Sequence, residues 1–194
     1  MNIGIYIYEN AEVLDFSGPF EVFSTANRFI KDCNQVYLIG QTSQTINARG
    51  GFNVIPHFNI AEHPPLDLLI VVGGVHDQEM KKSAVIDWIS EQNEKVKYIA
   101  SVCTGAFLLA EAGVLNNLVV TTHWEDIESL ALSYQDLTVK PNVRWIEQER
   151  VLTSGGISAG IDMSLYLIEK LFGKSIALKT AKQMEFRWQQ IPDE

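Results

Sequence analysis

An apolar run that ends abruptly at a cysteine is the feature of this sequence that most constrains its fold. Residues 98–102 are mostly apolar, Cys103 follows directly, and Thr104-Gly105 then opens a stretch with helical apolar spacing that stops at Gly113. This order predicts a strand, a sharp turn and a helix, an arrangement that lifts a nucleophilic side chain above the end of a parallel sheet. The sequence therefore predicts an α/β fold with a reactive thiol at a strand end.

The position of Cys103 also suits its chemistry. The thiolate, not the thiol, is the nucleophile, and backbone amides at the start of a helix favour the negative charge. We therefore expect Cys103 to be a thiolate nucleophile. The alternative is a buried cysteine that acts only as a small hydrophobic side chain. Gly105 and the abrupt change from strand to helix favour the functional interpretation.

The rest of the chain alternates strands with helices. Strands are predicted at residues 2–8, 35–40, 67–72, 97–102, 118–121, 143–146 and 150–153, with a small hairpin made of 45–46 and 52–55. Helices are predicted from Pro19 to residue 30 and over 78–93, 105–113, 124–132, 158–171 and 174–190. The nearly all-apolar strand at 67–72 is typical of a parallel sheet covered on both faces. We predict one domain over residues 1–194, with a doubly wound, mostly parallel sheet flanked by helices, as in flavodoxin-like folds.

Composition excludes several classes of function. The formal net charge of −9 argues against a nucleic-acid partner or an anionic membrane surface. No apolar run is long enough to span a membrane, and the N-terminus lacks the features of a signal peptide. The two cysteines, Cys33 and Cys103, form no disulfide framework, which predicts a cytoplasmic protein. Cys33, in a polar junction, is interpreted as structurally incidental.

No HxxxH or CxxC spacing occurs, so we expect no metal site. No GxGxxG or GxxxxGK motif occurs, so we expect no dinucleotide or P-loop cofactor.

A cysteine nucleophile needs a partner that moves protons. Asp15 follows the apolar pair Val13-Leu14 and precedes a turn-rich stretch, which places it beside the strand ends and partly removes it from water. A helix N-cap is the other common role of such an aspartate, and the local pattern leaves both open. Glu21 is the competing carboxylate, but a solvated position in the first turn of a helix suits it better.

Five further residues at predicted strand ends are candidates for binding substrate or a developing negative charge. Gly73-Gly74 would bring backbone amides close to an oxyanion, although the pair also suits a plain tight turn. Thr104 offers an amide and a hydroxyl directly beside the nucleophile. His123 ends a predicted strand, where a structural role is equally open. Gly156 lies in a glycine-rich turn and is a candidate pocket wall.

Five stretches of the chain resemble the ThiJ/PfpI superfamily, which has a class I glutamine-amidotransferase-like fold, and within it the isonitrile hydratase subgroup. They are Leu14–Phe23, Val71–Gly74, Ser101–Ala106, Thr121–Trp124 and Ser154–Asp162, in this order over nearly the full length. The resemblance implies a cofactor-independent hydratase, a lyase that converts a small isonitrile into an N-substituted formamide. It also implies a homodimer.

The resemblance implies roles for single residues as well. Cys103 matches the nucleophile that forms a thioimidate, Asp15 the general acid/base, and Thr104 the threonine beside the nucleophile. Gly73-Gly74 match the loop that lines the anion-binding backbone. The superfamily's proteases and amidases place a histidine directly after the cysteine, where this chain has Thr104, which weakens a peptidase interpretation.

Two alternatives stay open at this point. Members with glyoxalase activity carry a glutamate near the first strand–helix turn, where this chain has Asp15, and His123 matches a histidine near the cysteine in several branches. The chain is therefore either the expected hydratase, a glyoxalase-like or amidase-type cysteine enzyme, or a non-catalytic redox- or ligand-sensing member.

Overall fold

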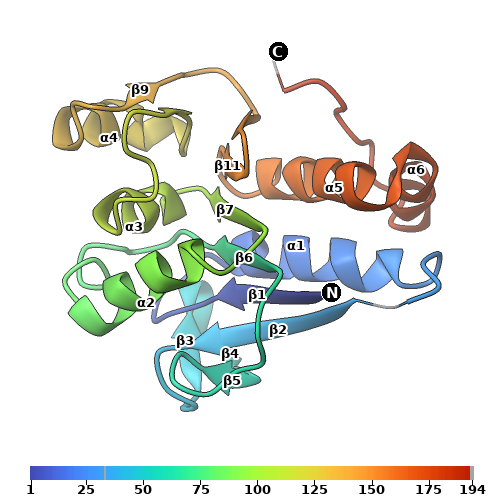
Figure 1. Ribbon diagram of the computed structural model, residues 1–194, viewed down its shortest axis with the longest axis horizontal. Coiled ribbons are helices and arrows are strands. Elements are labelled where there is room, and N and C mark those ends of the chain that lie inside the picture. Colours follow the sequence, from blue (N-terminus) through green and yellow to red (C-terminus); the bar gives the residue numbers. More distant parts are fainter. Residues whose placement is uncertain (33, 193–194) are drawn as a thin grey trace.

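A seven-stranded sheet forms the centre of the molecule in the computed structural model, which describes residues 1–32 and 34–192 (Figure 1). The strand order is β10-β11-β7-β6-β1-β2-β5. The bounds are β1 (Asn2–Tyr6), β2 (Gln35–Gly40), β5 (Phe58–Asn59), β6 (Leu68–Val71), β7 (Tyr98–Val102), β10 (Trp145–Gln148) and β11 (Val151–Ser154). All neighbours are parallel except β10 against β11. The predicted doubly wound, mostly parallel α/β fold is confirmed. Cys33 lies outside the described residues.

Helices cover both faces of this sheet (Figure 1). On one side α1 (Val13–Ala26), α5 (Ala159–Phe172) and α6 (Lys174–Gln183) pack against one another. On the other side α2 (Ser83–Asn93) packs against α3 (Gly105–Glu111). The short helices η2 (Trp124–Asp126) and α4 (Ile127–Ser133) follow one another beyond α3. None of the helices in the described part of the chain is long and apolar enough to cross a membrane.

Two small sheets lie outside the central one. The predicted hairpin is present as β3 (Ile46–Ala48) and β4 (Phe52–Val54), joined by the single turn η1 (Arg49–Gly51). The predicted strand at 118–121 is shorter, β8 (Val119–Val120), and pairs in parallel with β9 (Thr138–Val139). The sequence did not indicate β5 or β9, because two residues are too few to show an alternating pattern.

The start of α1 differs from the prediction. Pro19 was expected to open this helix, but the helix begins six residues earlier at Val13 and Pro19 lies inside it. Proline removes the N–H that would bond the carbonyl of Asp15, a loss that normally ends a helix. Here packing of α1 against α5 and α6 compensates, because half of the helix is buried against them. The predicted turn at Asp15 is therefore the first helical turn.

Two other helices are shorter than predicted. Helix α2 begins at Ser83 rather than at residue 78. Helix α6 ends at Gln183 rather than at residue 190, because the following segment leaves it to bond α5. The indole of Trp188 donates to the carbonyl of Asp162, and the amide of Gln189 donates to its carboxylate.

The three central strands hold a fixed register. All four residues of β6 are fully buried, and most of β1 and β7 is buried as well. Tyr6 of β1 pairs with Val71 of β6, and Val71 pairs with Ser101 of β7. The carboxyl ends of these strands therefore lie side by side, which is where sites form in such sheets.

Candidate active site

Cys103 occupies the sharp turn between β7 and α3 that the sequence predicts. Its φ of +56° is in the left-handed region, which costs a residue other than glycine roughly 1–3 kcal/mol. Hydrogen bonds hold this conformation: the Cys103 amide donates to the carbonyls of Ser154 and Gly155, both at 3.2 Å. The Thr122 hydroxyl donates to the Cys103 carbonyl at 2.8 Å. The turn therefore presents the thiol in a strained and fixed position.

Two glycines allow the strand ends to pack around this turn. A Cβ on Gly73 would lie 2.7 Å from Cys103 Cβ and 2.6 Å from the Thr104 amide nitrogen. A Cβ on Gly105 would lie 2.2 Å from the carbonyl oxygen of Val71. Side chains at either position would push the nucleophile away from β6.

Substitution of Gly105 is expected to destabilise the fold strongly. Gly105→Ala should lower the free energy of unfolding by about 3 kcal/mol, because the obstructing atom belongs to backbone and cannot move aside. Gly155→Ala is the matched control, since its Cβ would meet Ala159 at an ordinary 3.5 Å and should cost less than about 1 kcal/mol. Urea unfolding measures the free energy of unfolding of both variants. Equal losses of stability in Gly105→Ala and Gly155→Ala would contradict the packing argument.

Asp15 is fully buried in the first turn of α1 and faces the same strand ends. One carboxylate oxygen accepts from the amide of Gly73 and the other from the amide of Ile157, each at 3.0 Å. The N-cap position belongs to Glu12, so Asp15 is not a helix cap. Burial raises the pKa of Asp15 to about 7, although both amides and the Cys103 thiol oppose this. A carboxyl titrating near neutral pH can act as both acid and base.

The Cys103 thiol is buried beside Asp15, which affects its pKa. Burial raises the pKa of the Cys103 thiol, and the negative charge of Asp15 raises it further, while the Thr104 amide lowers it. These effects oppose the thiolate expected from the helix start, because α3 is only seven residues long and the thiol is buried beside a carboxyl group. Attack by the sulfur requires an acceptor for its proton, and Asp15 lies in place for it.

The amides of Gly73 and Gly74 are engaged within the protein. The Gly73 amide holds Asp15, and the Gly74 amide donates to the Thr104 hydroxyl at 3.0 Å. The same hydroxyl donates back to the Gly74 carbonyl at 3.0 Å. The glycine pair thus orients Asp15 and Thr104 around Cys103.

A cavity of about 600 Å³ opens onto the thiol. Its walls include Cys103, Thr104, Gly74 and two histidines, and its rim carries the acidic residues Glu12, Asp77, Glu125 and Asp126. A larger cavity of about 820 Å³ beside η2 and α4 is not lined by the cysteine. The smaller cavity is therefore the candidate active site.

His123 lines this cavity at one side. Its Nδ1 lies 3.5 Å from Asp126 Oδ2 and 3.7 Å from Glu125 Oε2. Gly156 packs against the ring, since a Cβ there would lie 2.2 Å from His123 Cδ2. The structure therefore brings five of the candidate residues together around the Cys103 thiol: Asp15, Gly73, Gly74, Thr104 and His123. Gly156 contacts this group through His123 and lines the larger cavity.

Ile157 is a site residue that the sequence reasoning missed. It is β-branched, yet its φ is +55°, and its amide donates to Asp15. The only local signal is the preceding Gly155-Gly156 turn, which identifies a bend but not its partner. Glu21, the competing carboxylate, is exposed and accepts from the Thr25 hydroxyl within α1.

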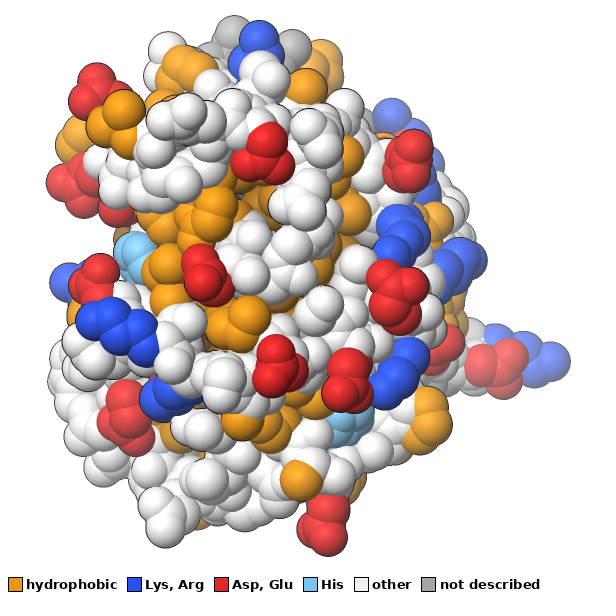
Figure 2. Space-filling model, turned by 60° about the vertical axis from the view of Figure 1, so that its left-hand side comes forward, with side chains coloured by type: hydrophobic (Ala, Val, Ile, Leu, Met, Phe, Trp, Pro, Cys, Tyr) orange, Lys and Arg blue, Asp and Glu red, His pale blue; other side chains and the backbone are white. Residues whose placement is uncertain are grey.

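Charged side chains of both signs lie on the surface of the molecule. On the face shown in Figure 2, basic side chains are interspersed with acidic ones around hydrophobic patches. Within the part of the chain that the structure describes, no three His, Cys, Asp or Glu side chains are grouped to hold a metal ion.

Known proteins share this sequence pattern and fold. The sequence profile of the DJ-1/PfpI family matches residues 1–170. The chain is 30% identical over 187 residues to the isonitrile hydratase of Pseudomonas putida, covering 96% of this chain and 78% of that protein. It is 29% identical over 171 residues to the HTH-type transcriptional regulator CdhR of Pseudomonas aeruginosa, covering 88% of this chain and 51% of the regulator. This chain thus spans about half of that regulator's length.

The fold is also similar to a solved structure. A ThiJ/PfpI family protein from Pseudomonas syringae superposes with a TM-score of 0.86 and 21% identity, covering 95% of this chain and 74% of that one.

Proposed function

The chain belongs to the DJ-1/PfpI family, and from this premise we propose that it is a cofactor-independent cysteine hydratase that converts an isonitrile into an N-substituted formamide. The observation that carries the proposal is the pairing of a buried thiol with a carboxyl whose pKa is about 7. The similarity to an isonitrile hydratase over 96% of the chain supports the choice of substrate.

The first step joins the isonitrile to the enzyme. The thiol proton of Cys103 passes to the Asp15 carboxylate, and Asp15 delivers it to the terminal carbon of R–NC. The sulfur forms a bond to the same carbon, which gives a thioimidate, R–N=CH–S–Cys103. A carboxyl with a pKa near 7 suits this exchange, because it can take the proton and release it at neutral pH.

The second step releases the product. Water adds to the thioimidate carbon, and its proton passes through Asp15 to the nitrogen. The hydroxyl proton of this adduct returns to Asp15 as the C=O bond forms and the C–S bond breaks. The sulfur keeps the electron pair and takes the proton from Asp15, which frees R–NH–CHO and restores the thiol.

The surrounding residues have supporting roles in this proposal. Gly73 and Gly74 hold Asp15 and Thr104 through their amides, so they act on the reacting groups indirectly. The Thr104 amide faces the sulfur and stabilises negative charge there. His123 forms part of the wall of the substrate cavity, and Gly156 supports its ring from behind. We also propose that the enzyme works as a homodimer in the cytoplasm.

Turnover of an aromatic isonitrile tests the proposal. The wild-type protein is expected to produce the N-aryl formamide, followed by absorbance and verified by chromatography. Turnover without added metal or cofactor supports the hydratase. An intact wild-type protein that forms no formamide would contradict it, and methylglyoxal would then be the next substrate.

The similarity to CdhR favours one other candidate function. In that case the cavity beside Cys103 binds a small molecule without converting it. Saturable binding of an isonitrile to the wild-type protein, with no formamide formed, would favour this function over the hydratase.

A further inference from the structure

Tyr8 carries a buried hydroxyl group that the fold does not use. The side chain is 2% exposed, and its hydroxyl has no hydrogen-bond partner within the described residues. A buried polar group without a partner destabilises a protein, so its presence calls for a reason. The neighbouring Tyr6 shows the ordinary arrangement, because its equally buried hydroxyl donates to Glu79 Oε1 at 2.5 Å.

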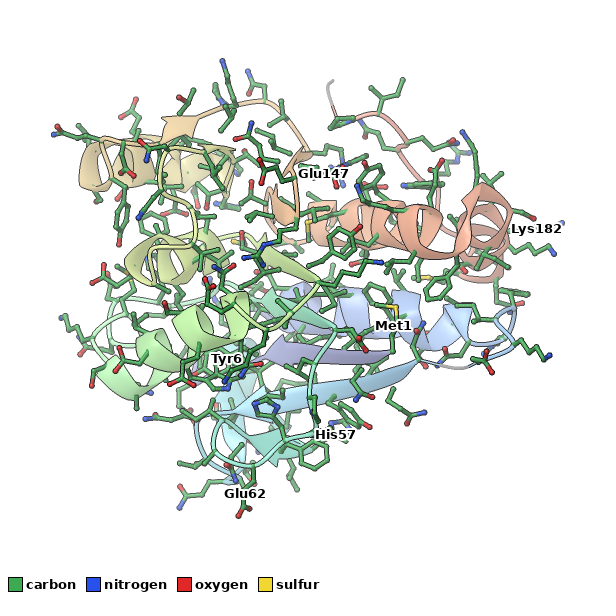
Figure 3. The ribbon with its side chains drawn as sticks, in the orientation of Figure 1. Met1, Tyr6, His57, Glu62, Glu147 and Lys182 are labelled. Carbon is green, nitrogen blue, oxygen red and sulfur yellow. The ribbon has the colours of Figure 1, made fainter. Side chains whose placement is uncertain are left out.

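The two tyrosines lie on the same face of the sheet. Their rings are stacked with centroids 6.1 Å apart, and the Tyr6 ring lies 5.4 Å from that of Trp88 in α2. Figure 3 shows Tyr6 extending from β1 toward α2. Tyr8 is two residues farther along the chain and thus closer to the carboxyl ends of the strands.

Tyr8 and the nucleophile both lie just beyond the carboxyl ends of their strands. Tyr6 pairs with Val71 and Val71 with Ser101, and Tyr8, Gly73 and Cys103 each follow these paired residues by two positions. The segment after Tyr8 is bound to the end of β6, since the Glu12 amide donates to the Gly73 carbonyl at 2.9 Å.

Gly73, after the end of the middle strand β6, carries no side chain. The space where its Cβ would lie is bordered by Cys103 Cβ at 2.7 Å and Thr104 Oγ1 at 2.8 Å. Gly73 thus leaves the Cys103 side chain and the Thr104 hydroxyl uncovered on the side of β6. The charge of Cys103 is among those that act on the Tyr8 hydroxyl.

The charges around Tyr8 show what its hydroxyl could serve. Burial raises the pKa of Tyr8, and the charges of Asp15, Glu79 and Cys103 raise it further, while the Thr104 hydroxyl lowers it. The Tyr8 hydroxyl therefore keeps its proton and stays a hydrogen-bond donor. Glu79 is already bonded to Tyr6 and, at 2.7 Å, to Lys82. Both oxygens of Asp15 already accept from backbone amides. The charge that appears on Cys103 when its proton leaves is met by the Thr104 amide, while the Thr104 hydroxyl is already bonded to Gly74.

We propose that Tyr8 is a positioning residue whose hydroxyl is reserved for the ionised form of Cys103. When the thiol proton moves to Asp15, Tyr8 turns its hydroxyl toward the sulfur and donates a hydrogen bond, keeping its own proton. The proposal deepens the proposed function, because hydration depends on this thiolate, but it concerns the thiol itself and can be tested without an isonitrile.

Alkylation of Cys103 by iodoacetamide over a range of pH tests this role. Mass spectrometry follows the peptide that contains Cys103, so the alkylation rate of Cys103 is measured separately from that of Cys33. In Tyr8→Phe, the pH profile is expected to shift upward by about one unit, and the rate at pH 7 to fall about three- to tenfold. Its melting temperature should equal or exceed that of the wild type, because only an unpartnered hydroxyl is lost.

Tyr6→Phe is the matched control on the same strand. It removes the hydrogen bond to Glu79, so the melting temperature should fall while the alkylation profile stays within about twofold of the wild type. An unchanged profile in Tyr8→Phe, or an equal shift in Tyr6→Phe, would overturn the proposal. A melting temperature of Tyr8→Phe below the wild type would overturn it too. A shifted profile in a protein that hydrates no isonitrile would contradict the proposed function alone.

Discussion

Replacing Cys103 by alanine is expected to reduce hydration of an aromatic isonitrile by at least about a thousandfold. Its sulfur lines the cavity and forms the bond that divides the reaction into two steps. Alanine preserves the backbone amide and carbonyl that hold the turn, so the fold should survive. Steady-state formation of the formamide measures the loss, with the melting temperature as a check of folding.

The second cysteine of the chain provides the control. Cys33→Ala should retain the wild-type rate, since the proposed chemistry involves one thiol. Cys103→Ala protein that keeps a tenth or more of the wild-type turnover would end the hydratase proposal.

Asp15→Asn is expected to lower kcat/KM by about 10³-fold, within the range for loss of a general acid/base. Asparagine accepts one backbone hydrogen bond but cannot take the thiol proton. In the wild type, kcat/KM should rise with pH and level off above about 7, because the carboxylate form of Asp15 must accept that proton. A wild-type profile without this rise would contradict the assigned role.

The same substitution should change how stability depends on pH. The folded-state pKa of Asp15, about 7, lies above its ordinary value of 3.8, so between these values the folded state binds more protons than the unfolded state. The contribution of Asp15 to the free energy of unfolding is therefore fully present below pH 4 and is lost as the pH rises through 7. The total loss is on the order of 4 kcal/mol. Urea unfolding at several pH values should show a smaller loss in Asp15→Asn.

Local sequence signals predicted the parts of the site that depend on neighbouring residues. The apolar run before Cys103 and Gly105 after it identified the turn, because both belong to one short segment. The strand ends at Gly73 and Gly156 were placed correctly for the same reason. The central parallel strands could be predicted because burial on both faces leaves an unbroken apolar run.

Features that depend on distant contacts could not be predicted in this way. The amide of Ile157 holds Asp15 across 142 residues, and no local pattern encodes that bond. Pro19 was misread because its effect on α1 is overcome by packing against α5 and α6. Local sequence also does not indicate that burial beside Asp15 raises the pKa of the Cys103 thiol, against the effect of the helix start.

The two bonds to the Asp15 carboxylate also have a consequence for the time at which the proposed site is assembled. They reach across 58 residues to Gly73 and across 142 residues to Ile157, so they are among the long-range contacts that form late in folding. A chain emerging from the ribosome exposes the Cys103 segment well before Ile157 has been synthesised. During that interval the cysteine has no oriented proton acceptor. The proposed activity is therefore expected only in the completely folded chain, and its recovery after dilution from denaturant should report the last stage of folding.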